Sequence, residues 1–268
     1  MSIARSLGPR LISAMRRSFD ADYRGEILRK LGTKMAAPAL AVDARAAAEW
    51  CAAHETDANV WATALDAELW REAEVFAAEQ DLRGRALAHG LALGGGGFVA
   101  LLYFATRLRR PACIVETGVA AGRSSRAFLR AMEENGSGQL YSSDLPYLAI
   151  EGSEQNIGVI VESELRARWR LFTRGDRRNL SEVAAELESG QKIELFHYDS
   201  DKTYEGRGYA WMTLRPLLAP NALVIFDDIQ DNTHFRDLVA ELKAPFRVFQ
   251  SSRKWIGMFE LGGGRFTS

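Results

Sequence analysis

The sequence predicts an α/β protein: a Rossmann-like, seven-stranded, doubly wound sheet with a helical extension at its N-terminal end. Short apolar runs alternate with helix-like segments from Pro111 onward, and this repetition is typical of parallel β-α-β units. The last two apolar runs are separated only by Gln250–Lys254, which is too short for a crossover and predicts an antiparallel hairpin. Before residue 90 the chain is rich in Ala, Glu, Arg and Trp and has few strand-like runs.

Seven strands are expected, five in parallel β-α units and two in the terminal hairpin. Their ranges are Ala112–Glu116, Gln139–Ser143, Arg170–Phe172, Ile193–Tyr198, Ala222–Phe226, Phe246–Phe249 and Trp255–Phe259. Helices are expected at Ser124–Glu134, Asn179–Glu188, Tyr204–Leu218 and His234–Leu242. Ligands bind such sheets beyond the carboxyl ends of the strands. The chemistry should therefore follow directly after the apolar runs.

Residues 1–93 are expected to form a helical extension, and residues 94–268 the main domain. Asp43–Gln80 is interpreted as helix with Asp43 as its N-cap. Trp61, Leu65 and Leu69 recur at four-residue spacing, which indicates a buried stripe. The glycines at positions 94–97 are interpreted as a hinge between the two parts.

The first nineteen residues carry four arginines and no acid, and their apolar residues recur every four positions. An organellar presequence has this pattern, but the interpretation adopted is an amphipathic arm that packs on the body or on a second subunit. The N-terminal helices are accordingly expected to form a lid, an acceptor contact or a contact within a homo-oligomer.

Composition excludes several classes of protein. The chain has 268 residues, with 34 basic and 35 acidic side chains, so no overall field attracts nucleic acid. Two cysteines, Cys51 and Cys113, exclude a disulfide framework and favour a reducing, cytoplasmic location. The longest uncharged run, Gly90–Thr106, falls short of the roughly 20 residues of a membrane span and is interrupted by glycines.

A glycine-containing turn follows the expected first strand. It runs from Glu116 through Gly118 to Gly122, with two serines opening the next helix. Small residues allow close approach of a ligand, and a helix N-terminus offers free N–H groups. The spacing G-x-x-x-G lacks the third glycine of a dinucleotide fingerprint. A carboxylate at Glu116 suits a ligand with an ammonium group, such as S-adenosylmethionine (SAM), and Asp144 after the second strand suits ribose hydroxyls.

At this turn the chain resembles the class I SAM-dependent methyltransferases, and E-T-G-V-x-x-G-x-S-S is similar to the macrocin O-methyltransferase group. The resemblance covers roughly residues 98–259. It implies that Glu116 and Gly118 contact the methionine end of SAM, that Asp144 contacts the ribose, and that the loop after the third strand contacts the adenine. The expected cofactor-binding set is Glu116, Thr117, Gly118, Gly122, Ser124, Ser125, Asp144, Gly175, Asp176 and Asp199. The alternative for Asp176 is an N-cap of the next helix.

Three acids follow the fourth and fifth expected strands: Asp199, then Asp227 and Asp228. If those strands are neighbours, about 4.8 Å apart, the carboxylates converge at one sheet edge. Their repulsion requires protonation or a cation. Oxygen-only ligands favour Mg²⁺, with Mn²⁺ or Ca²⁺ as alternatives. The competing interpretation is that these acids cap helices and pair with arginines.

The stretch D-S-D-K-T-Y, residues 199–204, resembles the D-x-D-K-x-x-Y stretch of the caffeoyl-CoA type, with the tyrosine one residue early. This chain has Asp227-Asp228, and in this it resembles the macrocin-like group, which carries Asp-Asp there. The catechol and caffeoyl-CoA methyltransferases carry Asp-Asn at the same place. That resemblance favours a sugar or natural-product hydroxyl over a catechol. Lys202 and Asp201 are the candidate bases, and His197 is expected within a strand as a satisfied core histidine.

The function expected from these features is Mg²⁺-dependent O-methylation of a small-molecule hydroxyl by SAM. A second hypothesis is a non-catalytic binding or scaffold protein that keeps the methyltransferase fold. A third is a nicotinamide-dependent oxidoreductase, which the missing third glycine disfavours.

Overall fold

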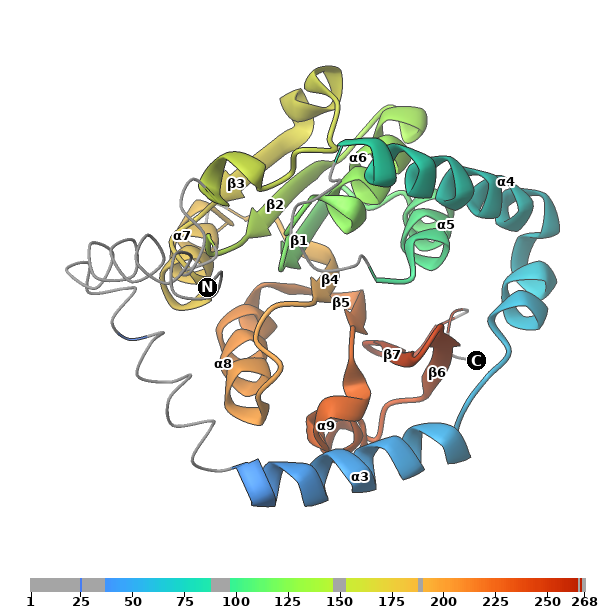
Figure 1. The fold of residues 1–268 in the computed structure, drawn as a ribbon, viewed down its shortest axis with the longest axis vertical. Helices are drawn as coiled ribbons and strands as arrows, with labels where there is room; N and C mark the ends of the chain where they lie inside the picture. The colour runs from blue at the N-terminus through green and yellow to red at the C-terminus, as the bar shows by residue number, and fades with distance from the viewer. Residues whose placement is uncertain are drawn as a thin grey trace, which may run out of the picture.

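Seven strands form one sheet in the computed structural model, in the order β3-β2-β1-β4-β5-β7-β6 (Figure 1). The structure describes residues 25, 37–87, 97–146, 153–187, 190–264 and 266. Strands β1 to β5 pair in parallel, and β7 runs antiparallel to both β5 and β6. The predicted doubly wound sheet with a terminal hairpin is therefore confirmed. The strands are β1 Cys113–Thr117, β2 Gln139–Ser143, β3 Trp169–Phe172, β4 Ile193–Tyr198, β5 Leu218–Phe226, β6 Phe246–Ser251 and β7 Lys254–Glu260.

Helices cover both faces of the sheet. The α-helices are α3 Ala37–Ala53, α4 Ala58–Leu87, α5 Val99–Arg109, α6 Arg123–Asn135, α7 Asp176–Leu187, α8 Tyr204–Leu214 and α9 His234–Leu242. Short 3₁₀ helices lie at Ser153–Asn156, Ser163–Arg168, Arg215–Leu217 and Ile229–Asp231. One buried cluster joins α4, α5 and α6 to the sheet, and a second joins α7, α8 and α9, with Cys51 of α3, to its other face. Figure 1 shows α4, α5 and α6 together on one side, and α3, α8 and α9 on the other.

Side-chain alternation assigns each strand residue to one of these two clusters. Ile114 of β1 belongs to the first cluster, and its neighbours Cys113 and Val115 belong to the second. Leu195 of β4 likewise belongs to the first cluster, and Phe196 to the second. Both faces are buried, which explains why these strands appear in the sequence as continuous apolar runs.

Residues 37–87 form two helices, α3 and α4, where the sequence predicted a single helix at Asp43–Gln80. Asp43 lies inside α3 and is not an N-cap, so that prediction was wrong. Its carboxylate instead accepts a hydrogen bond from the backbone N–H of Thr233 (3.3 Å). The chain breaks before α4, where Asp57 accepts a hydrogen bond from Val60 N–H (2.9 Å), and α4 kinks at Asp66, which caps Leu69 in the same way. Local capping by these two acids interrupts the helix.

Helix α4 packs on the main body of the protein. Trp61, Trp70 and Phe76 share one buried cluster with Phe104 of α5. The predicted stripe is thus buried at Trp61 and partly buried at Leu65 and Leu69. The N-terminal arm, the 93/94 boundary and positions 94–96 of the expected hinge lie outside the described residues.

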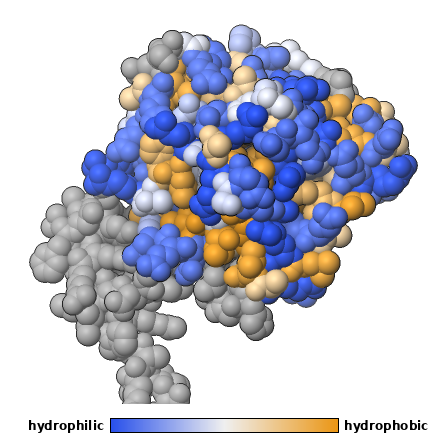
Figure 2. Space-filling view, turned by 90° about the horizontal axis from the view of Figure 1, so that it is seen from above, coloured by the Kyte–Doolittle hydropathy of each residue, from blue (hydrophilic) through white to orange (hydrophobic). Residues whose placement is uncertain are grey.

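Helix α5 follows Gly97 and is buried over residues 100–106. Within the described residues, every helix is too short or too polar to cross a lipid bilayer. The face shown in Figure 2 is largely hydrophilic, with hydrophobic residues scattered across it.

Candidate active site

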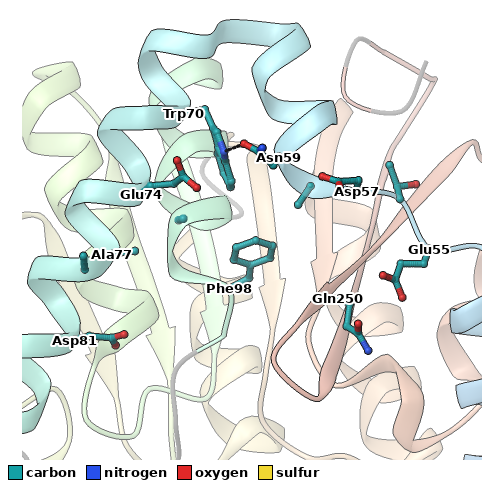
Figure 3. A pocket seen from close by; sticks show the side chains of 13 residues that line it. Glu55, Asp57, Asn59, Trp70, Glu74, Ala77, Asp81, Phe98 and Gln250 are labelled. Atoms are coloured by element: carbon teal, nitrogen blue, oxygen red, sulfur yellow. Dashed lines mark hydrogen bonds between the residues drawn. The ribbon is translucent and has the colours of Figure 1, made fainter.

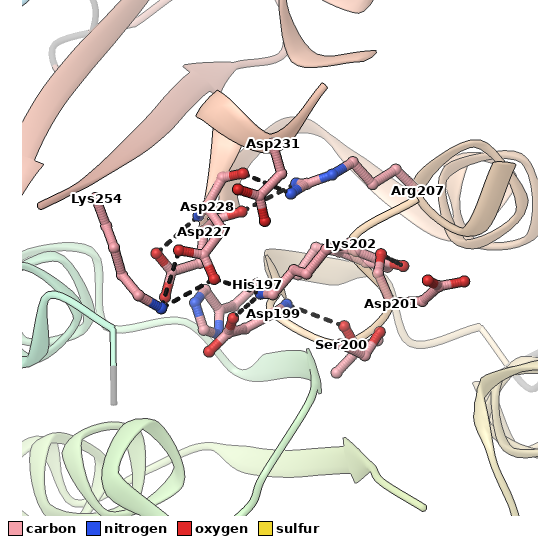
Figure 4. A network of polar contacts seen from close by, with 12 residues as sticks. His197, Asp199, Ser200, Asp201, Lys202, Arg207, Asp227, Asp228, Asp231 and Lys254 are labelled. Carbon is pink, nitrogen blue, oxygen red and sulfur yellow. Dashed lines mark hydrogen bonds and ion pairs between the residues drawn. The ribbon is translucent and has the colours of Figure 1, made fainter. Parts of the chain in front are cut away.

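Three carboxylates meet at the carboxyl ends of β4 and β5. Asp199 directly follows β4, Asp227 and Asp228 follow β5, and these two strands are paired neighbours. The backbone N–H of Asp227 donates to Tyr198 O (2.9 Å), so the ladder continues past the strand ends. One carboxylate oxygen of each acid lies within 4.8 Å of the others (Figure 4). We call these three residues the carboxylate trio.

A left-handed backbone at Asp228 brings two consecutive side chains to the same cluster. Along a strand, successive side chains point to opposite faces. Asp228 has φ 53° and ψ 40°, and this reversal turns its carboxylate back toward that of Asp227. Arg207 of α8 is buried and donates to the backbone carbonyls of Asp227 (3.0 Å) and Asp228 (2.8 Å). The guanidinium thus holds the reversal in place.

Two lysines pair with the trio. Lys202 Nζ bonds Asp199 Oδ1 and lies 3.0 Å from Asp228 Oδ2. Lys254 Nζ lies 2.9 Å from Asp228 (Figure 4). Sequence reasoning missed Lys254, although the expected hairpin contained the signal. An antiparallel return strand begins at the edge where the parallel strands end, and Lys254 is the first residue of β7.

The trio has unequal electrostatics. Burial, and then repulsion from Asp199 and Asp228, raises the pKa of Asp227 to about 7. Burial also raises the pKa of Asp228, but Lys202 and Lys254 outweigh it and hold that pKa below its usual value. Asp227 is fully buried, and its Oδ2 has no hydrogen-bond partner among the described residues.

Such an orphaned oxygen costs about 1–3 kcal/mol unless a ligand satisfies it. A hard divalent cation would do so, because it prefers a set of carboxylate oxygens. The donor set therefore fits the metal site that the sequence suggests.

The predicted methionine-end residues surround the end of β1. Glu116 is buried, and its Oε2 accepts hydrogen bonds from Ser125 Oγ (2.6 Å) and Ser142 Oγ (2.8 Å). Its Oε1 has no partner in the described part of the chain. Burial raises the pKa of Glu116 to about 7, against hydrogen bonds from Ser124, Ser125 and Ser142 that lower it. A free carboxylate oxygen at this position fits a ligand's ammonium group.

The turn after β1 needs its glycines. Gly118 has φ +80°, and a β-carbon there would collide with the carbonyl oxygen of Asp199. Gly122 has φ +93°, and a β-carbon there would lie 2.8 Å from the Cα of Gly158. Thr117 is buried, and its Oγ1 accepts the N–H of Asp199 (3.2 Å), which ties the turn to the trio. The glycine turn and the trio therefore share one edge of the sheet.

The predicted ribose and adenine residues lie beyond β2 and β3. Asp144 accepts hydrogen bonds from the N–H groups of Ala120 (2.8 Å) and Leu145 (2.7 Å), and burial raises its pKa to about 6. Asp176 opens α7, and its carboxylate accepts hydrogen bonds from Ser143 (2.7 Å) and Ser200.

Gly175 has φ +87° beside Asp176. Asn179, which sequence reasoning missed, joins these two loops by donating to Asp144 O (3.0 Å) and Phe172 O (3.0 Å). Its position one turn into α7 was the available signal.

The candidate bases differ in position. Lys202 reaches the trio, whereas the carboxylate of Asp201 accepts hydrogen bonds from Thr203 N (3.2 Å) and Oγ1 (3.0 Å) (Figure 4). Burial lowers the pKa of Lys202, but the charges of Asp199, Asp228 and Asp227 outweigh it and raise that pKa.

His197 lies within β4, as predicted, and is fully buried. It is not a satisfied core histidine, because neither ring nitrogen has a partner among the described residues. Burial lowers its pKa to about 4, so the ring is neutral near pH 7.

A cavity of about 820 Å³ lies between α4, the start of α5 and the end of β6. Phe98 stands between Glu74 and Ala77 of α4 and Gln250 of β6, and Trp70 is fixed by a hydrogen bond to Asn59 (2.9 Å) (Figure 3). Phe98 follows Gly97, where a β-carbon would lie 2.5 Å from Asp227 Oδ2. Gly97 thus packs against the trio, and its neighbour Phe98 lines the cavity.

Comparison with known proteins gives a consistent picture. Residues 115–229 match the model of a family described as "Methyltransferase domain". No curated protein sequence gives a significant match.

Solved structures are similar in fold. A putative caffeoyl-CoA O-methyltransferase from Staphylococcus aureus has a TM-score of 0.52 at 13% identity, covering 66% of this chain and 90% of that one. The O-methyltransferase TomG from Streptomyces achromogenes, in complex with SAM, has a TM-score of 0.50 at 14% identity, covering 69% and 89%. An O-methyltransferase from Bacillus cereus, in complex with SAH, has a TM-score of 0.50 at 16% identity, covering 72% and 90%. Residues 115–229 therefore match a methyltransferase-domain family, and the sheet has the Rossmann-like fold of these solved structures.

Proposed function

We propose that this protein is a SAM-dependent O-methyltransferase that acts on a hydroxyl group of a small molecule at a divalent cation, with Mg²⁺ the expected ion. The observation that carries the proposal is the buried, unpartnered Oδ2 of Asp227, within the carboxylate trio and beside the glycine turn. The names of the three solved neighbours, all O-methyltransferases, support the same reaction class.

Residues around β1, β2 and β3 would bind SAM. Glu116 offers Oε1 to the ammonium group, and Gly118 and Gly122 leave room for close approach. Ser124 and Ser125 lie in the first turn of α6, whose free N–H groups favour the ligand's carboxylate. Asp144 would bind the ribose hydroxyls. Gly175 and Asp176 would lie at the adenine, and Thr117 and Asp199 would hold the turn in place.

The trio would hold the cation through Asp199, Asp227 and Asp228. When bound, SAM supplies an electrophilic methyl group and the cation supplies charge that favours an anionic acceptor oxygen. The contribution of the chain is to fix both partners at one sheet edge in near-attack geometry. Of the two candidate bases, Lys202 has its Nζ at the trio, whereas Asp201 is turned to Thr203. Lys202 could accept the hydroxyl proton only after its pairing with Asp199 and Asp228 is released, because that pairing keeps it protonated.

The acceptor would occupy the cavity beside Phe98. Its lining combines residues of the 1–93 segment, such as Trp70 and Glu74, with Phe98 and Gln250 of the 94–268 segment. This shared lining supports the division into a helical extension that covers the acceptor and a catalytic domain. A volume of about 820 Å³ suits a sugar or natural product.

The test combines binding and turnover. Purified protein should bind S-adenosylhomocysteine in calorimetry and transfer a labelled methyl group to members of a panel of hydroxyl compounds. EDTA should abolish turnover and Mg²⁺ should restore it. Asp227→Asn should lose the Mg²⁺ response, because it removes a charged oxygen from the trio.

Glu182→Gln on the surface of α7 is the matched control and should behave as wild type. Turnover that ignores both EDTA and Asp227→Asn would reject the cation. Thermal stabilisation by a nicotinamide cofactor instead of S-adenosylhomocysteine would reject the reaction class, and tight binding without methyl transfer to any panel member would favour a scaffold role.

A further inference from the structure

We infer that Lys254 competes with the divalent cation for Asp228 and thereby sets the affinity of the carboxylate trio for metal. The inference rests on the proposed cation site and assigns a role to a residue outside it. Lys254 Nζ lies 2.9 Å from both Oδ1 and Oδ2 of Asp228. Its ammonium group therefore straddles the whole carboxylate, which is the position a cation ligated by Asp228 must reach.

Charge balance makes this pairing and cation binding mutually unfavourable. The trio offers three carboxylates, and Lys202 and Lys254 bring two ammonium groups to them. These lysines already offset most of the negative charge. A divalent ion placed among the same oxygens would lie close to both ammonium groups, and like charges at such distances in a partly buried site repel strongly. At least one lysine must withdraw when the cation binds.

Lys254 is the lysine that is free to withdraw. Its side chain is 44% exposed, against 30% for Lys202. It begins β7 directly after the exposed turn residues Ser252 and Arg253. Lys202 is anchored more firmly, because it bonds Asp199 as well as Asp228, and its backbone carbonyl accepts a hydrogen bond from Asn232 (2.8 Å).

The consequence is an exchange of one cation for another at Asp228. Without the divalent ion, Lys254 neutralises this carboxylate and stabilises the cation-free protein. With the ion, Lys254 points to solvent. Removal of the ammonium group should therefore tighten metal binding. It should also increase the gain in stability that the protein obtains when the metal is added.

The experiment measures Mn²⁺ binding directly, by electron paramagnetic resonance and calorimetry on the full chain. Lys254→Met should lower the Kd for Mn²⁺ by roughly tenfold or more, the size expected for loss of one close charge pair. Lys254→Arg keeps the charge and can pair with both oxygens of Asp228, so it should not lower the Kd for Mn²⁺. The control is Lys192→Met, next to β4 at the opposite edge of the sheet, where the ammonium group bonds Pro216 O (3.1 Å). It should match wild type.

A second readout is thermal unfolding with and without Mn²⁺. Lys254→Met should gain more in Tm from Mn²⁺ than wild type does. An unchanged or higher Kd for Lys254→Met, with wild type binding Mn²⁺ normally, overturns this inference alone. Wild-type protein that binds S-adenosylhomocysteine but no Mn²⁺ overturns the cation site of the proposed function and the inference with it.

Discussion

Glu116 and His197 lie side by side on the neighbouring strands β1 and β4, with His197 Nδ1 3.9 Å from Glu116 Oε1. Neither atom has a hydrogen-bond partner in the described part of the chain. His197 lies two residues before Asp199, and Glu116 lies two residues before Gly118. The buried pair therefore connects the strand that leads into the glycine turn with the strand that leads into the carboxylate trio.

Glu116→Gln should remove a pH dependence of stability. Burial raises the pKa of Glu116 to about 7, whereas an unfolded glutamate titrates near ~4.3. The folded state thus binds this proton more tightly, and the stability it contributes is complete below about pH 4 and lost as pH rises to about 7. Glutamine does not titrate. The variant should therefore gain on the order of 3 kcal/mol relative to wild type between pH 4.5 and 8, measured by urea unfolding.

The same variant, Glu116→Gln, should bind the cofactor less tightly although it is more stable. Glutamine offers no counter-ion to an ammonium group, so the Kd for S-adenosylhomocysteine should rise. Glu194→Gln is the control, because Glu194 lies on the same strand as His197 but bonds Ala112 N–H (2.6 Å) at its other end. It should keep the wild-type affinity for S-adenosylhomocysteine. Parallel pH profiles for wild type and Glu116→Gln would show that Glu116 is ionised in the folded protein.

Gly118→Ala should impair cofactor binding as well as stability, whereas Gly136→Ala should lower stability moderately and leave cofactor binding unchanged. Both glycines have positive φ, +80° and +72°. Strain alone costs an alanine there about 1–2 kcal/mol. Nothing lies within 4 Å of a β-carbon at Gly136, but one at Gly118 would meet the backbone of Asp199. Urea unfolding should give about 1–2 kcal/mol for Gly136→Ala and clearly more for Gly118→Ala, which should also weaken S-adenosylhomocysteine binding. Equal losses in the two variants would contradict this.

Arg207→Met should unfold the Asp227–Asp228 turn. The guanidinium is 1% exposed and satisfies two buried carbonyls, so its removal should cost about 3–5 kcal/mol. Mn²⁺ affinity should fall as well, because the trio loses its geometry. Arg215→Met is the control, since Arg215 is exposed and stacks on Trp211 (5.7 Å to the ring centroid). It should cost less than about 1 kcal/mol. A metal affinity unaltered by Arg207→Met would separate the turn from the cation site.

Ala78→Trp should obstruct the acceptor without affecting the cofactor. Ala78 is an exposed residue of α4 that lines the cavity, so an indole ring there would narrow it. The KM for the acceptor should rise roughly tenfold, while the Kd for S-adenosylhomocysteine stays the same. Val75→Trp, on the same helix but outside the cavity lining, should have neither effect. An acceptor KM insensitive to Ala78→Trp would place the acceptor elsewhere.

The sequence predicted the sheet and the edge on which the acids gather, because both depend on local patterns. Buried parallel strands appear as apolar runs, and the residues after them must lie at one edge. The hairpin followed from the short gap before Lys254 in the same way. By contrast, the break between α3 and α4 depended on capping by Asp57 and Asp66. Such capping competes locally with the helix, and it leaves the apolar periodicity that predicts a helix unchanged.

Features that arise from long-range pairing were not predicted. Lys254 meets Asp228 only because β7 pairs with β5. His197 lies beside Glu116 only because β4 pairs with β1. The role of Arg207 depends on the backbone reversal at Asp228, which no periodicity encodes.

The left-handed backbone at Asp228 restricts which residues can occupy position 228. Aspartate, asparagine and glycine are the residues that adopt a left-handed backbone at little cost. In a saturation library, folding would therefore retain chiefly these three, and selection for an oxygen donor would then remove glycine. Conformation and the need for an oxygen donor together thus reduce the choice to an acid or its amide, which are the two residues that distinguish the macrocin-like and catechol-like signatures at this position.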